Sequence, residues 1–234
     1  SVPEEPEPPT TGVPTDGVDY AEIENLRIKN LWIYSLTKGN FPEELGRDQR
    51  GMAAHNGNIY ISERSNGAGY LLEFNGETGE YQRTIALTGD YKTLYEGNSL
   101  GYLCNDVFVD NAGHLCVSNM VLSFSSSSQL TICIVDINTG ATTRVFETYI
   151  NSASMRFDYC SVYGDITKTG AKVFAAASSH SGSSSYRNRV YCWTRSADHI
   201  AGTDQYYDWK TYSYSSASSY YPQNASNFGS GPRV

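Results

Sequence analysis

One pattern recurs along the chain and limits the folds that are open to it. A turn containing glycine separates two short runs of β-forming residues at Gly57, at Gly113 and again at Gly170, in steps of 56 and 57 residues. Such a turn between such runs predicts a β-hairpin. A second hairpin follows in the first two units, over residues 68–87 and 129–148. Each unit therefore predicts about four short antiparallel strands, the pattern of a propeller blade.

The predicted fold class is all-β, with antiparallel four-stranded blades forming a β-propeller or part of one. A single blade cannot cover both of its faces, so repetition would let each sheet bury a face on the next. Three blades are recognisable, over residues 51–87, 104–149 and 158–210. Closed propellers typically have about four to eight blades. We therefore expect residues 23–234 to be a fragment of a longer propeller, an open stack, or a unit that pairs with another copy.

The N-terminal residues 1–22 are predicted to be a flexible tether. The first 17 residues contain five prolines and four acidic residues. Proline removes backbone donors and like charges repel, so such a segment stays extended. A tether of this kind follows the lipidated cysteine in many bacterial surface lipoproteins, and an ordinary disordered terminus is the alternative. Beyond it, residues 31–36 are apolar on both alternating faces, which predicts a strand buried on both sides.

The overall charge excludes several classes of partner. The net charge is −8, and no basic stripe is present that could neutralise phosphates, so nucleic-acid binding is not expected. Anionic lipid head groups would repel the chain for the same reason. No apolar run reaches the roughly 18 residues that a membrane-spanning helix needs. Contact with a membrane is therefore expected only through an N-terminal lipid anchor.

The cysteines are expected to be buried apolar residues in strands. No pair has the C-x-x-C spacing of zinc or redox sites. Their odd number leaves at least one unpaired within a monomer. Cys116 and Cys133 fall on predicted neighbouring strands, so a disulfide between them is an alternative. The five are Cys104, Cys116, Cys133, Cys160 and Cys192.

Several short motifs occur in order between about residue 28 and residue 200. They are Trp32, Pro42, Arg50-Gly51-Met52-Ala53 and Tyr60 with Arg64 near the first unit, Asn105-Asp106-Val107 in the second, and Gly164-Asp165 in the third. In this order they resemble a family of Bacteroidetes surface lipoproteins of unknown function, although Met120 stands where the family has leucine. The resemblance implies a β-propeller-like domain, an exported or outer-membrane location and no established activity. Members of that family tend to be longer, which favours the fragment hypothesis.

Three carboxylates are candidates for a site at the channel mouth of the predicted propeller. Asp106 and Asp158 fall near the starts of two blades, and Asp165 follows. Residues at the start of an inner propeller strand line the central channel, and two carboxylates several ångströms apart can act as acid and base on a glycosidic bond. The alternative is that these side chains cap turns.

An aromatic cluster near the C-terminus is the second candidate binding site. Tyrosine and tryptophan offer flat apolar faces with a polar group, and sugars stack on such faces. Cross-strand packing is the alternative. The residues are Tyr206, Tyr207, Trp209, Tyr212 and Tyr214.

Other motifs have simpler interpretations. The sequence GNSLG at 97–101 fits G-x-S-x-G, but a predicted strand follows it instead of a helix, so we interpret it as a chance match. DNAG at 110–113 and DINTG at 136–140 are interpreted as turns rather than calcium loops. The four histidines His55, His114, His180 and His199 lack metal-binding spacing, so no metal or other cofactor is predicted.

The leading functional hypothesis is a non-catalytic binding or scaffold protein whose partner is a glycan or another surface protein. The alternative is a propeller-type carbohydrate-active enzyme that uses the acidic residues at the channel mouth. A third hypothesis is oligomerisation through exposed blade faces. The expected location is the outer-membrane or extracellular surface of a bacterium, with lipid anchoring, and the periplasm is the alternative.

Overall fold

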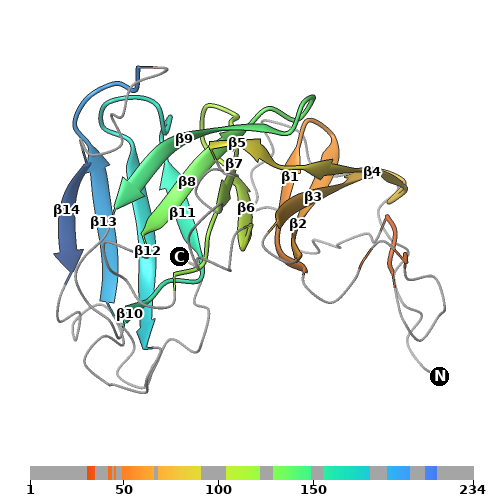
Figure 1. Ribbon diagram of the computed structural model, residues 1–234, viewed down its shortest axis with the longest axis horizontal. Helices are drawn as coiled ribbons and strands as arrows, with labels where there is room; N and C mark the ends of the chain where they lie inside the picture. Colours follow the sequence, from red (N-terminus) through yellow and green to blue (C-terminus); the bar gives the residue numbers. More distant parts are fainter. Residues whose placement is uncertain are drawn as a thin grey trace, which may run out of the picture.

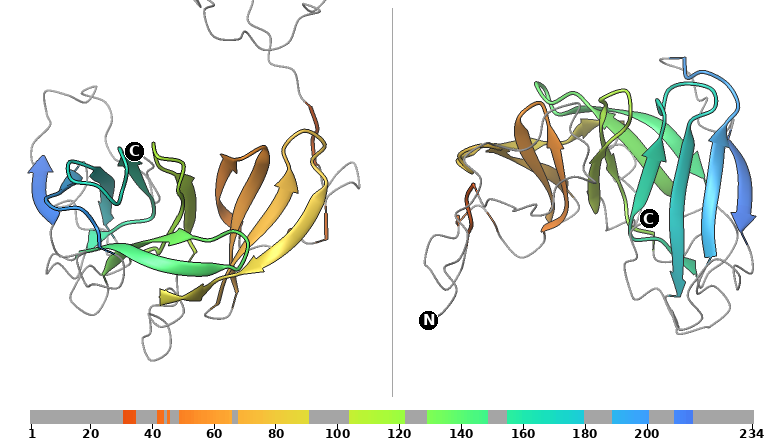
Figure 2. Two further views of the ribbon diagram at one scale, coloured as in Figure 1. Left: turned by 90° about the horizontal axis from the view of Figure 1, so that it is seen from above. Right: turned by 180° about the vertical axis from the view of Figure 1, so that it is seen from behind.

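The chain folds into three antiparallel β-sheets that stand side by side (Figure 1). Seen from above, the sheets follow one another along an arc (Figure 2). Among the described residues, no helix is long and apolar enough to cross a membrane. The computed structural model describes residues 31–34, 42–43, 45, 49–65, 68–90, 104–121, 129–148, 155–179, 189–200 and 209–214.

The first sheet is a meander in which each strand pairs with the next. Its β1–β2 turn has positive φ at both central residues, Asn56 (48°) and Gly57 (79°), as a two-residue hairpin of the predicted kind requires. The strands are β1 (Gln49–His55), β2 (Asn58–Ser65), β3 (Ala68–Asn75) and β4 (Tyr81–Ala86).

The second sheet has the order β5-β9-β8-β7-β6. Its antiparallel strands form the two predicted hairpins of the second unit, while β5 comes directly after the first sheet and pairs in parallel with β9. The strands are β5 (Thr88–Gly89), β6 (Asp106–Val109), β7 (Leu115–Ser118), β8 (Leu130–Val135) and β9 (Ala141–Thr148).

The third sheet contains the strand that the sequence pattern left undefined. Trp209–Tyr214 forms β14, which pairs with β13 along its whole length. The sheet has the order β10-β12-β13-β14, with β11 also paired to β12. Its other strands are β10 (Met155–Arg156), β11 (Cys160–Tyr163), β12 (Lys172–Ser179) and β13 (Arg189–Arg195).

The three recurring turns occupy equivalent places in the three sheets. Gly57 joins β1 to β2, Gly113 lies between β6 and β7, and Gly170 lies between β11 and β12. Their φ angles are 79°, 89° and 88°. The strand before each turn is an edge strand, and β6 packs beside both β1 and β11. We call β1, β6 and β11 the inner strands.

The middle sheet buries both of its faces, as the repeat predicts for neighbouring sheets. All four residues of β7 are buried, which explains its continuous apolar run Leu-Cys-Val. The interface with the first sheet includes Leu71, Ile85, Val107, Leu115, Val117 and Cys133. The interface with the third sheet includes Cys116, Ile132, Phe146, Phe157, Tyr191 and Trp193.

The expected strand at residues 31–36 is wrong for its described part. Residues 31–34 are not in a strand, and Leu31 and Ile33 are 65% and 51% exposed. Only one side of the segment packs, because it lies on the β3–β4 turn instead of between two sheets. There the Trp32 indole donates a hydrogen bond to the carbonyl of Gly76 at 3.0 Å. Residues 35–36 and the predicted tether lie outside the described residues.

The five cysteines are buried and free, so the disulfide that the sequence left open is not formed. Val117, not Cys116, is the direct cross-strand partner of Cys133. Successive residues of a strand point to opposite faces of the sheet. Cys116 therefore packs in the interface with the third sheet, whereas Cys133 packs in the interface with the first.

Candidate functional site

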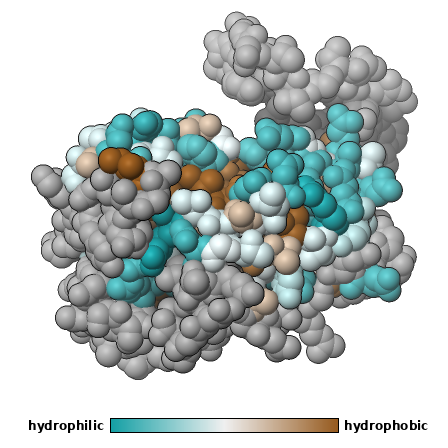
Figure 3. Space-filling model, turned by 45° about the horizontal axis from the view of Figure 1, so that its top comes forward, coloured by the Kyte–Doolittle hydropathy of each residue, from teal (hydrophilic) through white to brown (hydrophobic). Residues whose placement is uncertain are grey.

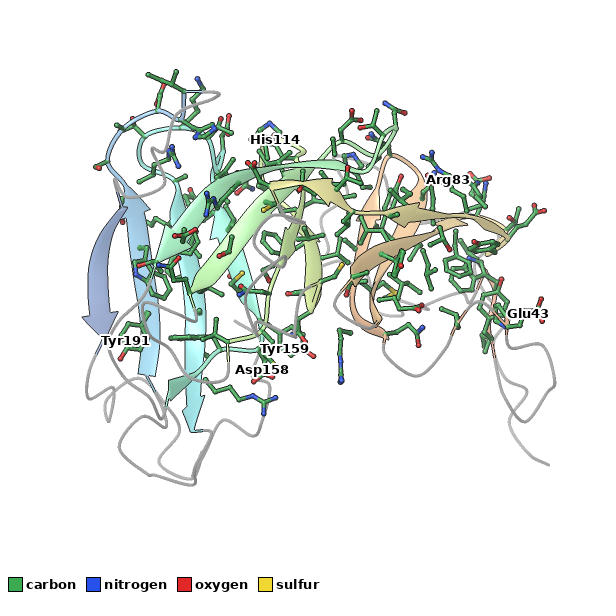
Figure 4. The ribbon with its side chains drawn as sticks, in the orientation of Figure 1. Glu43, Arg83, His114, Asp158, Tyr159 and Tyr191 are labelled. Atoms are coloured by element: carbon green, nitrogen blue, oxygen red, sulfur yellow. The ribbon has the colours of Figure 1, made fainter. Side chains whose placement is uncertain are left out.

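The three predicted carboxylates do not come together in one site. Asp158 precedes β11 and Asp165 follows it, and this four-residue strand is itself about 13 Å long. Asp165 lies beside His114, with 3.7 Å between its Oδ1 and the His114 Nδ1. Figure 4 shows Asp158 and His114 at opposite ends of the inner strands. Two separate polar clusters therefore result.

The first cluster lies where the inner strands begin. The buried Asp158 carboxylate accepts hydrogen bonds from the Nε and Nη2 of Arg156, the former at 2.8 Å. The Asn105 side chain donates to the backbone carbonyl of Asp158, which joins the second sheet to the third. Both carboxylate and carbonyl of Asp158 are thus engaged within the protein.

Asp106 belongs to the same cluster and is packed against the first sheet. Its side chain is buried, and its Oδ1 accepts the backbone N–H of Val107 at 3.0 Å. Gly51 of β1 approaches so closely that a Cβ placed there would lie 2.3 Å from this Oδ1. The backbone of β1 therefore packs directly against the Asp106 Oδ1.

The second cluster joins the inner turns of the second and third sheets. Asp110 begins the β6–β7 turn, and its Oδ1 accepts the backbone N–H groups of Ala112 and His114 at 3.0 and 2.8 Å. Its Oδ2 accepts the N–H of Ile166, across the seam, at 2.9 Å. The same Oδ2 lies 2.9 Å from the His114 Nδ1. Aspartate favours such turns because its short side chain reaches neighbouring backbone N–H groups.

Two further contacts cross this seam beside Asp110. The Asn111 Oδ1 accepts the N–H of Gly164 at 2.6 Å, and the Asn111 N–H donates to the Gly164 carbonyl at 3.3 Å. Asp165, the next residue, uses its Oδ1 to accept the N–H and the hydroxyl of Thr167. The seam is therefore a set of paired turns with well-defined polar partners.

Electrostatics keep the Asp110 carboxylate charged. Burial raises the pKa of Asp110, but the hydrogen bonds from Ile166 and His114 outweigh it and hold the pKa below its ordinary value. Asp110, His114 and Asp165 each offer a ligand atom, and these atoms lie within 4.8 Å of one another. One imidazole and two carboxylates form a donor set that can hold a divalent metal ion.

Spacing along the sequence does not reveal this cluster, because its members belong to different units. Asp110 and His114 lie 51 or more residues before Asp165, and each motif alone has the composition of a turn. An available signal was the recurrence of aspartate in the inner turns of two consecutive units, with a histidine four residues after the first. The expectation of no metal was based on the spacing of the histidines along the sequence. That spacing contains no information about contacts between distant residues.

A third buried polar group lies in the first sheet, around Glu73. Its Oε1 accepts the Tyr60 hydroxyl and the Asn58 amide at 2.8 and 2.7 Å, and its Oε2 accepts the Arg83 Nε at 2.5 Å. Arg83 also donates to the carbonyl of Ile137, in the β8–β9 turn of the second sheet, at 3.0 Å. Burial, with the hydrogen bond to Glu73, raises the pKa of Tyr60 to about 12. This group links two sheets and offers no reactive side chain at neutral pH.

The aromatic candidates are only partly placed. Trp209, Tyr212 and Tyr214 lie on β14, beside β13, but their side chains are outside the described residues. Tyr206 and Tyr207 are also outside, as are His180 and the G-x-S-x-G segment at 97–101. Ligand binding by these aromatic residues stays a prediction.

The described surface offers no broad apolar face in the view of Figure 3. Hydrophilic residues prevail there, with small hydrophobic patches between them. Large apolar side chains that are well exposed are few among the described residues and come from different elements. They are Leu31, Ile33, Met52, Tyr163 and Ile200.

Comparison with known proteins gives a partial likeness to a solved structure. No family model and no curated protein matches the chain. A crystal structure of a DUF4623 family protein from Bacteroides eggerthii is similar with a TM-score of 0.46 and 14% sequence identity. The match covers 70% of this chain and 34% of that one, so this chain corresponds to about a third of that protein's length. A likeness of this extent does not assign the chain to a family.

Proposed function

We propose that the protein is a non-catalytic binding or scaffold protein of a bacterial cell surface. The observation that carries this proposal is how its buried carboxylates are used. Asp158 pairs with Arg156, Asp110 accepts backbone N–H groups from two sheets, and Glu73 binds Arg83 and Tyr60. These groups join strands and sheets to one another, as a scaffold requires.

The enzyme alternative receives no support from this arrangement. Hydrolysis of a glycosidic bond needs two carboxyl groups about 5–10 Å apart on either side of the bond. Asp158 and Asp165 lie at opposite ends of β11, and Asp106 is covered by the backbone at Gly51. Asp165 therefore lies a strand's length from Asp158, and the side chains of Asp158 and Asp106 are buried.

For the architecture, we propose that the three sheets are successive blades of a propeller that this chain does not complete. Support comes from the neighbouring inner strands β1, β6 and β11, from the arc in Figure 2 and from the burial of both faces of the middle sheet. Further blades of a longer chain, or another copy, would cover the end sheets. The proposed location, a lipid-anchored position on the outer membrane, follows from the sequence resemblance and the composition of residues 1–22.

The proposed ligand is a glycan bound through the aromatic residues around β14. A glycan array screened with the chain, followed by calorimetry on the best ligand, tests this directly. We expect Trp209→Ala and Tyr212→Ala each to weaken binding about fivefold or more, since one stacked ring contributes on the order of 1 kcal/mol or more. Tyr163→Ala is the matched control, because Tyr163 is an exposed tyrosine at the end of β11, in a different part of the sheet.

Two outcomes would overturn parts of this proposal. An array without any bound glycan, together with a partner protein recovered by pull-down, would replace the glycan with a protein ligand. Release of shorter sugars that stops in Asp158→Asn would instead establish the enzyme and refute the non-catalytic proposal.

A further inference from the structure

We propose that Asp110, His114 and Asp165 bind one divalent transition-metal ion, represented by Zn²⁺, at the seam between the second and third sheets. The ligand atoms would be the Asp110 Oδ2, the His114 Nδ1 and the Asp165 Oδ1. These three residues come from two turns that the fold brings together, and their ligand atoms lie within 4.8 Å of one another. The site is independent of the glycan-binding proposal.

The separations fit the edges of a coordination polyhedron. The His114 Nδ1 lies 2.9 Å from the Asp110 Oδ2 and 3.7 Å from the Asp165 Oδ1. With metal–ligand bonds of about 2.1 Å, these separations correspond to ligand–metal–ligand angles of about 90° and 120°. The third separation, between the two carboxylate oxygens, is at most 4.8 Å, and a metal would need them within about 4.2 Å of each other, which side-chain rotation would have to provide.

The charges around the site are unbalanced in the direction that favours a cation. Two carboxylates meet at a single imidazole, and in the described part of the chain no lysine or arginine forms an ion pair with Asp110 or Asp165. The nearby Lys168 instead pairs with Asp198, at 3.3 Å. A divalent ion would neutralise the two carboxylates where no basic side chain does so.

The degree of burial suits a site that is rigid on one side and open on the other. The Asp110 side chain has 0% exposure, whereas those of His114 and Asp165 are 33% and 29% exposed. Three backbone N–H groups hold the Asp110 carboxylate in position. The exposed side gives an ion a path of entry and leaves room for water to complete the coordination.

The donor set also selects the class of ion. An imidazole nitrogen beside two carboxylates suits Zn²⁺ and similar transition metals, while Mg²⁺ and Ca²⁺ prefer oxygen alone. Because the ligands come from two sheets, the ion would cross-link them and stabilise the folded chain.

Titration of the metal-free full chain with Zn²⁺ by calorimetry tests the proposal. We expect one Zn²⁺ per chain, a higher Tm with Zn²⁺ than with Mg²⁺, and visible absorption bands from bound Co²⁺. His114→Ala and Asp165→Asn should each weaken Zn²⁺ binding about tenfold or more, since even supporting residues of metal sites have effects of this size. Asp165→Asn keeps the oxygen that accepts the Thr167 hydrogen bonds, so the turn is retained.

His55→Ala and Asp136→Asn are the matched controls. His55 lies beside the equivalent turn of the first sheet, and Asp136 caps the β8–β9 turn without a histidine. Both should bind Zn²⁺ like the unmodified chain, and circular dichroism checks that every variant is folded. The proposal is refuted if the unmodified chain binds no Zn²⁺, or if folded His114→Ala and Asp165→Asn bind it undiminished, for instance through His180.

Discussion

The two interfaces of the middle sheet are built from different residues. The interface with the first sheet is mainly aliphatic, with Tyr60 as its aromatic member among the described buried residues. In the interface with the third sheet, Trp193 lies at the centre of a ring cluster. Its ring centroid is 5.7 Å from that of Phe146, 6.0 Å from that of Phe157 and 5.8 Å from that of Tyr191. The same repeat thus supports two kinds of core.

The two interfaces also use different polar contacts. Between the first and second sheets, Arg83 reaches the Ile137 carbonyl and the Ser62 hydroxyl donates to the Asn105 carbonyl. Between the second and third sheets they include the inner turns at Asp110 and Asn111. The repeat therefore specifies strands and turns, while the contacts that join neighbouring sheets differ from one interface to the other.

Removing the central ring of the aromatic interface should have the largest effect. Trp193→Ala is expected to lower the free energy of unfolding by about 3–5 kcal/mol, because it leaves a large cavity among three other rings. Leu71→Ala makes a smaller cavity in the aliphatic interface and should lower it by about 2–4 kcal/mol. Urea unfolding of both variants measures the difference. A larger loss for Leu71→Ala would show that the aliphatic interface is the stronger one.

The next effect concerns a glycine at the seam of the first two sheets. Gly140 has φ 74°, and a Cβ there would lie 2.1 Å from the Ala86 carbonyl oxygen. Gly140→Ala should destabilise the chain by about 2–4 kcal/mol, through a strained backbone and a displaced strand. Gly113→Ala is the control, since Gly113 has φ 89° but no atom within 4 Å, and should lower stability by about 1 kcal/mol. Equal losses in thermal unfolding would contradict the close approach at Gly140.

A smaller, pH-dependent effect is expected at Glu73. Burial raises the pKa of Glu73, but its bonds with Arg83, Tyr60 and Asn58 outweigh this and lower the pKa below 4.5. Its contribution is therefore present above the unfolded-state pKa and is lost as the pH falls through the folded-state value. Glu73→Gln should lower stability by about 1–3 kcal/mol at pH 7 and by less at pH 3.

Urea unfolding of this variant at both pH values gives the comparison. The pKa of Asp110 is also lowered, so part of the acid dependence should remain in Glu73→Gln. An equal loss at the two pH values would mean that the Glu73 charge does not stabilise the first sheet.

The smallest expected effect is that of a reducing agent. Cys116 and Cys133 lie in different interfaces, so dithiothreitol should leave the Tm unchanged. Burial raises the pKa of both thiols, so alkylation of the native chain should be slow. Mass spectrometry after brief alkylation shows which thiol reacts first, and hence which interface opens more readily. A change of several degrees in the Tm on reduction would reveal a disulfide. It would refute the placement of Cys116 and Cys133 in different interfaces.

What the sequence predicted well depends on local chemistry. The turns at Gly57, Gly113 and Gly170 were predictable because a positive φ selects glycine within a few residues. The β-forming runs on either side of the turn at residues 136–140 likewise predicted a hairpin. The strand at Trp209–Tyr214 was missed because its aromatic and small polar residues have the composition of a binding loop, although pairing with β13 determines its structure.

Contacts between distant segments could not be predicted in the same way. The sequence places Asp106 and Asp158 near the starts of two blades, with Asp165 after them, but strand β11 separates Asp165 from Asp158. His114 meets Asp165 only because two inner turns pack together. Spacing along one chain contains no direct signal for such packing.

The two-residue strand β5 determines where this chain can be divided. Thr88–Gly89 follows the first sheet in the sequence but belongs to the second, where it forms the parallel edge beside β9. A cut after residue 90 would therefore remove an edge strand from the second sheet, whereas a cut after residue 87 leaves β5 with that sheet. Because the chain segment that ends the first sheet continues directly into an edge strand of the second, the three sheets should unfold in one cooperative transition rather than one after another.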